Sequence, residues 1–192
     1  MLLDEPSSFE AKMLTKPQKL KPLSRDIFTL RSATEEDLTK AFLMGQDAWG
    51  DNAPTAEYLE MCRNSIKYRS GNWSILTLPS GQPLSSVISY AFSDAALAPW
   101  IGIGSLATVI NERSKGYALM CLSMLIESYE LEHNVRNFML FSDIKSGIYA
   151  AAGFQNARSV GYDEQAGNLM LKTSNIKKAE AERLLQVYVN YF

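Results

Sequence analysis

The chain has 192 residues, of which 46% are hydrophobic and 21% are charged, and its formal net charge at pH 7 is −2. These values suit one globular domain with a substantial core, and they exclude a largely disordered chain. A near-neutral charge with dispersed basic residues also argues against nucleic acid or an anionic membrane as a partner. His133 is the one histidine, which excludes a zinc site with several histidine ligands.

Residues 1–25 form the first segment, and Pro6, Pro17 and Pro22 interrupt it so often that a regular helix is not expected. We expect an extended leader that is a solvated arm rather than a binding tail. Residues 26–192 are predicted to form a single domain that ends in a helix.

The amino terminus lacks the pattern of a secretory signal, because the acidic pair Asp4 and Glu5 follows residues 1–3 directly. No apolar run approaches the roughly 20 residues that a membrane span needs. Neither Cys62 nor Cys121 lies in a Cys-x-x-Cys pair, so both are expected to be buried, reduced thiols. Together these features predict a cytoplasmic protein without a membrane partner.

Helices and strands alternate along the rest of the chain. A strand is predicted over residues 27–31, and a loose capping box formed by Thr34 and Asp37 begins a helix that runs to about residue 49. The later elements are a helix with Tyr58, Leu59, Cys62 and Ile66 on one face, strands 73–78 and 84–92 joined by a turn, a long strand 101–110, a helix 116–132, a buried strand 138–141, a short helix 146–152, a hairpin of strands 155–162 and 168–173, and a last helix from residue 174. This order indicates the α/β class, with a mixed sheet flanked by helices.

The most informative segment, residues 108–118, lies between the long strand and the strongest helix. A helix that begins there presents backbone N–H groups to an anion. Gly116 lets a ligand approach the backbone, Ala118 leaves room in the first turn, and Arg113 and Lys115 add positive charge. These features predict a phosphate or pyrophosphate cradle, and the alternative is an ordinary glycine-containing loop before a core helix.

Two other phosphate motifs are excluded. The P-loop pattern G-x-x-x-x-G-K-[ST] is absent. Residues 102–107 match the dinucleotide pattern G-x-G-x-x-A, but that pattern must open a helix. Here it runs into Thr108, Val109 and Ile110, which favour extended structure. We therefore expect Gly102 and Gly104 to lie in a strand, against the alternative of a dinucleotide-binding oxidoreductase.

Residues 113–118, RSKGYA, fit the pattern [QR]-x-x-G-x-[GA], and residues 149–154 fit Y-x-x-x-G-F. With these two motifs and its element order over residues 27–173, the chain resembles the GNAT superfamily of acyl-CoA-dependent N-acetyltransferases. Ile110 and Ser142 depart from the proline and asparagine that are frequent in that family. The segments just before the two motifs are also similar to fungal lysine N-acetyltransferases, a likeness that does not identify the substrate.

The resemblance implies a GNAT-like fold in which acetyl-CoA donates an acetyl group directly to a primary amine of a small molecule or peptide. It implies no metal and no covalent enzyme intermediate. The implied cofactor-binding residues are the backbone of Leu106, Ala107 and Thr108 for the pantetheine arm, and the segment Arg113, Ser114, Lys115, Gly116, Tyr117 and Ala118 for the pyrophosphate. The alternative function is a catalytically silent acyl-CoA-binding regulatory module of the same fold.

Tyr149 is the candidate for the acid that protonates the leaving thiolate, because a phenol with a pKa near 10 keeps its proton at neutral pH. The alternative for Tyr149 is a packing role. The general base is left open among Glu112, Asp94 and Asp143, each of which also suits a solvated surface position.

An acceptor pocket is expected at the loop after the first helix, where Asp47, Trp49 and Asp51 gather, and at the C-terminal hairpin. Carboxylates beside an aromatic ring would suit a cationic amine. The apolar face of the last helix, with Tyr188 and Tyr191, either packs on the sheet or forms a homodimer contact.

Overall fold

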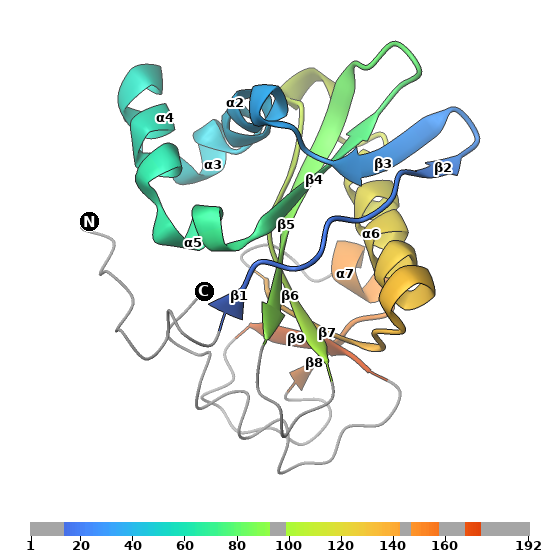
Figure 1. The fold of residues 1–192 in the computed structure, drawn as a ribbon. Coiled ribbons are helices and arrows are strands. Elements are labelled where there is room, and N and C mark those ends of the chain that lie inside the picture. Colours follow the sequence, from blue (N-terminus) through green and yellow to red (C-terminus); the bar gives the residue numbers. More distant parts are fainter. Residues whose placement is uncertain (1–13, 93–98, 143–146, 158–167, 174–192) are drawn as a thin grey trace.

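The computed structural model describes residues 14–92, 99–142, 147–157 and 168–173 (Figure 1). Within these residues, nine strands form one sheet in which β2, β3, β4, β5, β6, β7, β9 and β8 lie in that spatial order and β1 pairs with β5. In chain order the elements are β1 (Leu14–Thr15), β2 (Leu23–Arg25), β3 (Phe28–Ser32), α2 (Glu35–Leu43), α3 (Gln46–Trp49), α4 (Thr55–Asn64), α5 (Ile66–Ser70), β4 (Asn72–Thr77), β5 (Pro83–Phe92), β6 (Trp100–Thr108), the 3₁₀ turn η1 (Ile110–Glu112), α6 (Tyr117–His133), β7 (Asn137–Phe141), α7 (Gly147–Ala151), β8 (Gln155–Asn156) and β9 (Leu169–Lys172).

The sheet is mixed. β6 and β7 are parallel, whereas every other pairing among the described strands is antiparallel. The connection between the two parallel strands passes through α6, as parallel neighbours require a crossover. The predicted class, a mixed sheet flanked by helices, is confirmed.

Helices cover both faces of this sheet (Figure 1). On one face, side chains of α2 and α4 such as Phe42 and Tyr58 pack with Trp73 and Tyr90 of the strands. On the other face, the apolar residues of α6 and α7 pack against a second set of strand side chains that includes Ile103. Burial of these two cores supplies most of the stabilisation of such a fold.

Two predicted helices are each broken in the structure. The helix expected over residues 34–49 divides into α2 and α3 at Gly45, where a Cβ atom would lie 2.1 Å from the Trp49 ring. The next helix divides at Ser65, whose hydroxyl accepts the Tyr68 N–H at 3.2 Å and caps α5. The capping box at Thr34 is confirmed, with the Thr34 N–H donating to Asp37 Oδ2 at 2.9 Å.

The solvated arm expected for residues 1–25 is wrong over the part that the structure describes. β1 pairs with β5 and β2 pairs with β3, so this segment extends the sheet. Lys16, Lys19 and Lys21 are exposed, but Pro17 and Leu20 between them are buried. The apolar residues of the segment complete one face of the core. A segment rich in prolines and lysines does not indicate this burial from its sequence.

Both cysteines are buried and unbonded to each other, as predicted. Burial raises the pKa of Cys121 to about 12. β8 and β9 pair as expected, but their connecting turn, the last helix, Asp94 and Asp143 lie outside the described residues. No helix in the described part of the chain has both the length and the apolar character to cross a membrane.

Candidate active site

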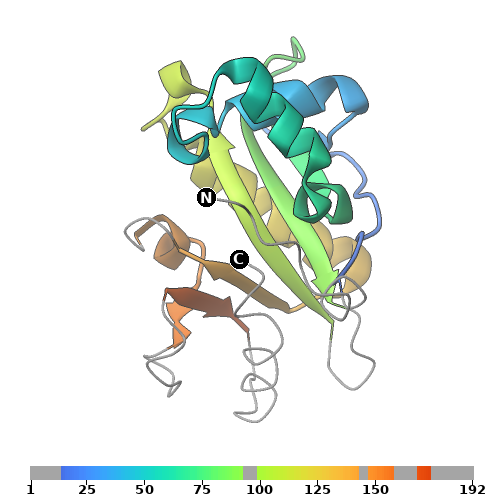
Figure 2. The same ribbon diagram turned by 90° about the vertical axis from the view of Figure 1, so that its left-hand side faces the viewer.

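β6 and β7 separate partway along their length, as Figure 2 shows. Their parallel pairing begins at Trp100 and Asn137 and ends at Ile103 and Leu140, although β6 continues to Thr108. Beyond Ile103, β6 has a neighbour only on the β5 side within the described residues. The edge that faces away from β5 therefore leaves backbone N–H and C=O groups of this half of β6 without a partner strand in the described part of the chain.

A β-bulge marks the point of separation. Ile88 of β5 pairs with Gly104, whereas Ser86 pairs with Ala107, so one residue of β5 faces two residues of β6. Ser105 adopts a φ of 44° in this bulge, and its hydroxyl donates to the Tyr68 hydroxyl at 3.3 Å. A bulge bends its strand and re-aims its side chains, which accounts for the turn of β6 away from β7.

The separation contains a cleft of about 410 Å³ between the two strands. Tyr149 enters it from α7 on the α6 side of the sheet, where the tyrosine is 6% exposed. Lys67 and Tyr68 enter from α5, which belongs to the opposite helical layer (Figure 1). The full lining is Trp49, Lys67, Tyr68, Ile103, Gly104, Ser105, Leu106, Leu140, Phe141, Ser142, Tyr149 and Asn168.

The sequence analysis did not single out Lys67 and Tyr68, which follow Ile66, the last residue that it placed on the face of the preceding helix. Burial lowers the pKa of Lys67. The pKa of Tyr68 is raised, chiefly by burial, and its ring stacks on Phe42 at 5.6 Å between centroids. The available signal was Ser65, because a serine that caps a new turn changes the helix direction and turns the next residues toward the sheet.

The predicted cradle lies beyond the end of β6. The chain leaves Thr108 through η1 and enters α6 at Gly116, which occupies the N-cap position with a φ of 86°. Ser114, Lys115 and Gly116 are exposed, and no atom lies within 4 Å of the position that a Gly116 Cβ would take. The first turn of α6 has backbone N–H groups without intrahelical partners, so the geometry fits an approaching anion.

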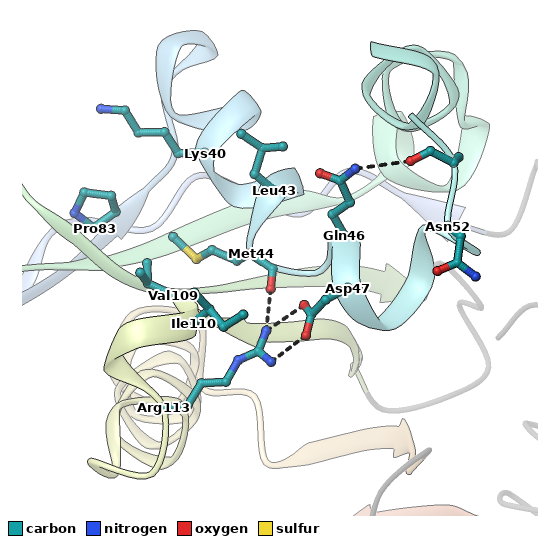
Figure 3. Close-up of a pocket in the computed structure, with 11 residues that line it drawn as sticks. Lys40, Leu43, Met44, Gln46, Asp47, Asn52, Pro83, Val109, Ile110 and Arg113 are labelled. Carbon is teal, nitrogen blue, oxygen red and sulfur yellow. Dashed lines mark hydrogen bonds and ion pairs between the residues drawn. The ribbon is translucent and has the colours of Figure 1, made fainter. Parts of the chain in front are cut away.

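The two cations of the cradle are each paired with a carboxylate, which corrects the expectation that they add net positive charge. Arg113 donates to both oxygens of Asp47 at 2.6 and 2.7 Å and to the Met44 carbonyl oxygen at 3.2 Å (Figure 3). Lys115 Nζ donates to Glu112 Oε2 at 2.8 Å. The hydrogen bond from Arg113 lowers the pKa of Asp47. Attraction for a phosphate at this turn therefore rests on the backbone N–H groups and the helix dipole.

Of the predicted pantetheine contacts, only Leu106 lines the cleft. The carbonyl oxygen of Ala107 accepts the Ser85 hydroxyl at 2.6 Å, and that of Thr108 accepts Arg113 Nε–H at 3.2 Å. Ala118 is half-buried, and the ring of the preceding Tyr117 packs on Phe28 with 5.6 Å between ring centroids.

The residues expected to form an acceptor pocket separate into two places. Trp49 lines the cleft, whereas Asp47 lines a second hollow of about 600 Å³ between α2, α3 and η1 (Figure 3). Asp51 is exposed and lines neither space. Glu112, one of the candidate bases, is paired with Lys115.

Gly102 and Gly104 lie within β6, as predicted. The strand continues for four residues after Gly104 and no helix begins there. The dinucleotide-binding alternative is therefore wrong, because its glycine pattern has to open a helix.

No protein-family model matches the chain, and a search of curated proteins finds no match. Solved structures do match. A GNAT family N-acetyltransferase from Escherichia coli in complex with CoA is 14% identical, with a TM-score of 0.55 over 81% of this chain and 83% of that one. A GNAT family acetyltransferase from Brucella melitensis in complex with acetyl-CoA is 11% identical, with a TM-score of 0.54 over 78% and 90%. The ribosomal-protein-S5-alanine acetyltransferase of Vibrio fischeri is 11% identical, with a TM-score of 0.57 over 81% and 97%. The chain has the GNAT fold.

Proposed function

We propose that this protein is an N-acetyltransferase that transfers the acetyl group of acetyl-CoA directly to a primary amine of a small molecule or peptide. One observation carries the proposal: the open edge of β6 leads from the cleft that contains Tyr149 to the exposed turn at Gly116. Two of the matching structures are complexes with CoA or acetyl-CoA, which supports this choice of donor.

The residues fit the two polar parts of the donor. The pyrophosphate would bind the N–H groups from Ser114 to Ala118, where Gly116 leaves space for it. The amide groups of the pantetheine arm would pair with β6 near Leu106, since the Ala107 and Thr108 carbonyls already accept hydrogen bonds. A carbonyl oxygen has a second lone pair, so those two residues still allow weaker contacts.

The chemistry follows from placing the thioester in the cleft. The neutral amine attacks the thioester carbon, the C–N bond forms, and the C–S bond breaks with its electron pair on sulfur. A backbone N–H of the open β6 edge would stabilise the negative charge that develops on the carbonyl oxygen. Tyr149 would donate its phenolic proton to the thiolate, and the proton released by the amine restores the phenol through solvent.

The alternative function is an acyl-CoA-binding regulatory module without turnover. It is favoured by the cleft lining, in which the described residues include no Asp or Glu that could accept the proton of the amine. Binding and turnover therefore have to be measured separately.

The test is calorimetry of the full chain with acetyl-CoA and NAD, followed by thiol release from acetyl-CoA with a panel of primary amines. We expect acetyl-CoA to bind, NAD not to bind, and at least one amine to release thiol. Binding without release for every amine would support the regulatory module. Absence of acetyl-CoA binding would contradict both functions.

A further inference from the structure

Tyr68 is held in place beside the β6 bulge. Its ring stacks on Phe42 with 5.6 Å between centroids and meets Trp73 edge-on at 5.1 Å. Its hydroxyl oxygen accepts a hydrogen bond from the Ser105 hydroxyl at 3.3 Å, and its backbone N–H donates to the Ser65 hydroxyl at 3.2 Å. These ring contacts and hydrogen bonds fix the phenol at the point where β6 bends.

The open edge of β6 ends at this bulge. β7 pairs with β6 up to Ile103, so a ligand that enters from Gly116 can follow the open edge only as far as the bulge. In the proposed complex the pyrophosphate binds at Gly116 and the pantetheine arm pairs with β6 near Leu106. The thioester at the end of that arm would therefore lie at the bulge, in the cleft that Tyr68 also lines.

The hydroxyl of Tyr68 can act as a hydrogen-bond donor. A hydroxyl has one O–H donor and two acceptor lone pairs, and the hydrogen bond from Ser105 occupies an acceptor position. That bond does not use the phenolic proton. The pKa of Tyr68 is raised, chiefly by burial, so the phenol keeps this proton at neutral pH. A fixed donor in a cleft with little water stabilises a developing negative charge more than the same donor does in bulk water.

We propose that Tyr68 is a catalytic residue that donates a hydrogen bond to the carbonyl oxygen of the thioester and stabilises the oxyanion that forms when the amine attacks. It acts together with a backbone N–H of β6. No proton is transferred from Tyr68, because its O–H bond stays intact and the carbonyl re-forms when the C–S bond breaks.

Tyr68 and Tyr149 would then serve different atoms of the donor. α5, which carries Tyr68, lies in the helical layer of α2 and α4, whereas α7, which carries Tyr149, lies with α6 on the other face of the sheet (Figure 1). Tyr149 protonates the sulfur from one side, and Tyr68 binds the oxygen from the other. This inference rests on the proposed acetyltransferase function and adds a residue to its mechanism.

The first test observes the carbonyl group and needs no acceptor. Acetyl-CoA that is isotope-labelled at the thioester carbonyl is bound to the full chain, and its C=O stretch is measured by isotope-edited infrared difference spectroscopy. A hydrogen bond to the oxygen polarises the C=O bond and lowers its stretching frequency. We therefore expect a higher frequency in Tyr68→Phe than in the wild-type protein.

The second test measures the rate with an accepted amine. Tyr68→Phe keeps the ring that packs on Phe42 and Trp73 and removes only the hydroxyl. We expect kcat to fall about 10- to 100-fold, because one oxyanion donor is lost while a backbone N–H of β6 remains. The dissociation constant for acetyl-CoA should change less than about threefold, because the hydrogen bond strengthens mainly in the transition state.

Two variants separate this role from a structural one. Ser105→Ala removes the hydrogen bond that ties Tyr68 to the bulge but leaves the phenolic proton, so kcat should fall less than in Tyr68→Phe and the carbonyl frequency should stay near the wild-type value. Tyr58→Phe is the matched control, because Tyr58 belongs to the same helical layer and its hydroxyl donates to the Phe42 carbonyl at 3.1 Å. It should lower thermal stability and leave both the carbonyl frequency and kcat at their wild-type values.

Three results would overturn the inference. The carbonyl frequency could be the same in the wild-type protein and Tyr68→Phe, Ser105→Ala could lower kcat as much as Tyr68→Phe does, or Tyr68→Phe could weaken acetyl-CoA binding without a change in kcat. Absence of acetyl-CoA binding would instead contradict the proposed function. If acetyl-CoA binds but no amine releases thiol, the transferase function fails, while the carbonyl frequency still reports whether Tyr68 bonds to the thioester, so the two failures are distinguishable.

Discussion

The two halves of β6 have the same partner on one side and different surroundings on the other. From Ile101 to Ile103 the strand pairs with both β5 and β7, and Trp100, Ile101 and Ile103 are at most 3% exposed. From Gly104 to Thr108 it pairs, among the described strands, only with β5, and it contains the bulge at Ser105. The first half contributes core and sheet, while the second keeps backbone groups available to a ligand.

Side-chain hydrogen bonds support the open half of β6, from Gly104 to Thr108. Ser85 donates to the Ala107 carbonyl, Ser105 donates to Tyr68, and Arg113 donates to the Thr108 carbonyl. These hydrogen bonds hold the strand in a bent path where it lacks the β7 ladder. Substitutions at the open end should therefore affect ligand binding and rate, and those near the closed part of the sheet should affect stability.

Gly116→Glu should have the largest effect. It places a negative charge where the pyrophosphate would bind, and we expect acetyl-CoA affinity to fall about 100-fold or more, as a repulsion of ~3 kcal/mol implies. Calorimetry with acetyl-CoA measures the loss.

Gly81→Glu is the control for backbone strain. Gly81 has a φ of 81° and open space around it, as Gly116 does, but it lies in the turn between β4 and β5. Both variants should lose similar thermal stability, since a side chain at positive φ costs about 1–2 kcal/mol. Equal acetyl-CoA affinity in the two folded variants would remove the cradle from the proposal.

Tyr149→Phe should have the next largest effect. It removes only the hydroxyl, and we expect kcat to fall about 100-fold with the KM for acetyl-CoA unchanged, the lower end of the range for a general acid. The lower end applies because the pKa of a thiol, near 8.5, makes it a tolerable leaving group. Steady-state and single-turnover rates with an accepted amine provide the measurement.

Tyr129→Phe is the matched control in the closed half. The Tyr129 hydroxyl lies 2.9 Å from the hydroxyl of Ser89, which pairs with Ile103 of β6. Its loss should cost about 1 kcal/mol of unfolding free energy and leave the rate unchanged. Wild-type turnover by Tyr149→Phe, with chemistry as the slow step, would make Tyr149 a packing residue.

Local patterns in the sequence predicted much of this arrangement. The β-rich run that became β6, the helix start at Gly116 and the short helix with Tyr149 each depend on neighbouring residues. The point where β6 leaves β7 depends instead on register with a strand more than thirty residues later. The Asp47 partner of Arg113 lies 66 residues away, so the neutralised charge of the cradle has no local signal.

Asp37→Asn tests the prediction that a substitution away from the open half of β6 changes stability and not ligand binding. Asp37 lies in the first turn of α2. Arg31 is the largest cause that holds the pKa of Asp37 far below its usual value, and Thr34 adds hydrogen bonds to the carboxylate. We expect a loss of about 1–3 kcal/mol in the free energy of unfolding at pH 7. Acetyl-CoA affinity should stay at the wild-type value.

The pH dependence of that loss has a definite sign. A lowered folded pKa adds stability that is fully present above the unfolded pKa of about 4 and is lost as pH falls toward the folded value. Urea denaturation should therefore show a smaller difference between wild type and Asp37→Asn at pH 3 than at pH 7. A difference that is constant or grows on acidification would assign the effect to something other than this carboxylate.

The smallest effect should come from the Arg113–Asp47 pair, which joins α3 to the loop just beyond β6. Their side chains are 39% and 45% exposed, so solvent screens the pair and its coupling should be about 0.2–1 kcal/mol. Arg113→Gln still fits the [QR] position of the motif and should change acetyl-CoA affinity less than about fivefold, because Asp47 already offsets the guanidinium charge. A double-mutant cycle with Asp47→Asn, repeated at high salt, should show a coupling in stability that weakens as salt is added. If Arg113→Gln instead loses as much affinity as Gly116→Glu, the guanidinium must leave Asp47 to hold the pyrophosphate, and the backbone of α6 is not the main anion site.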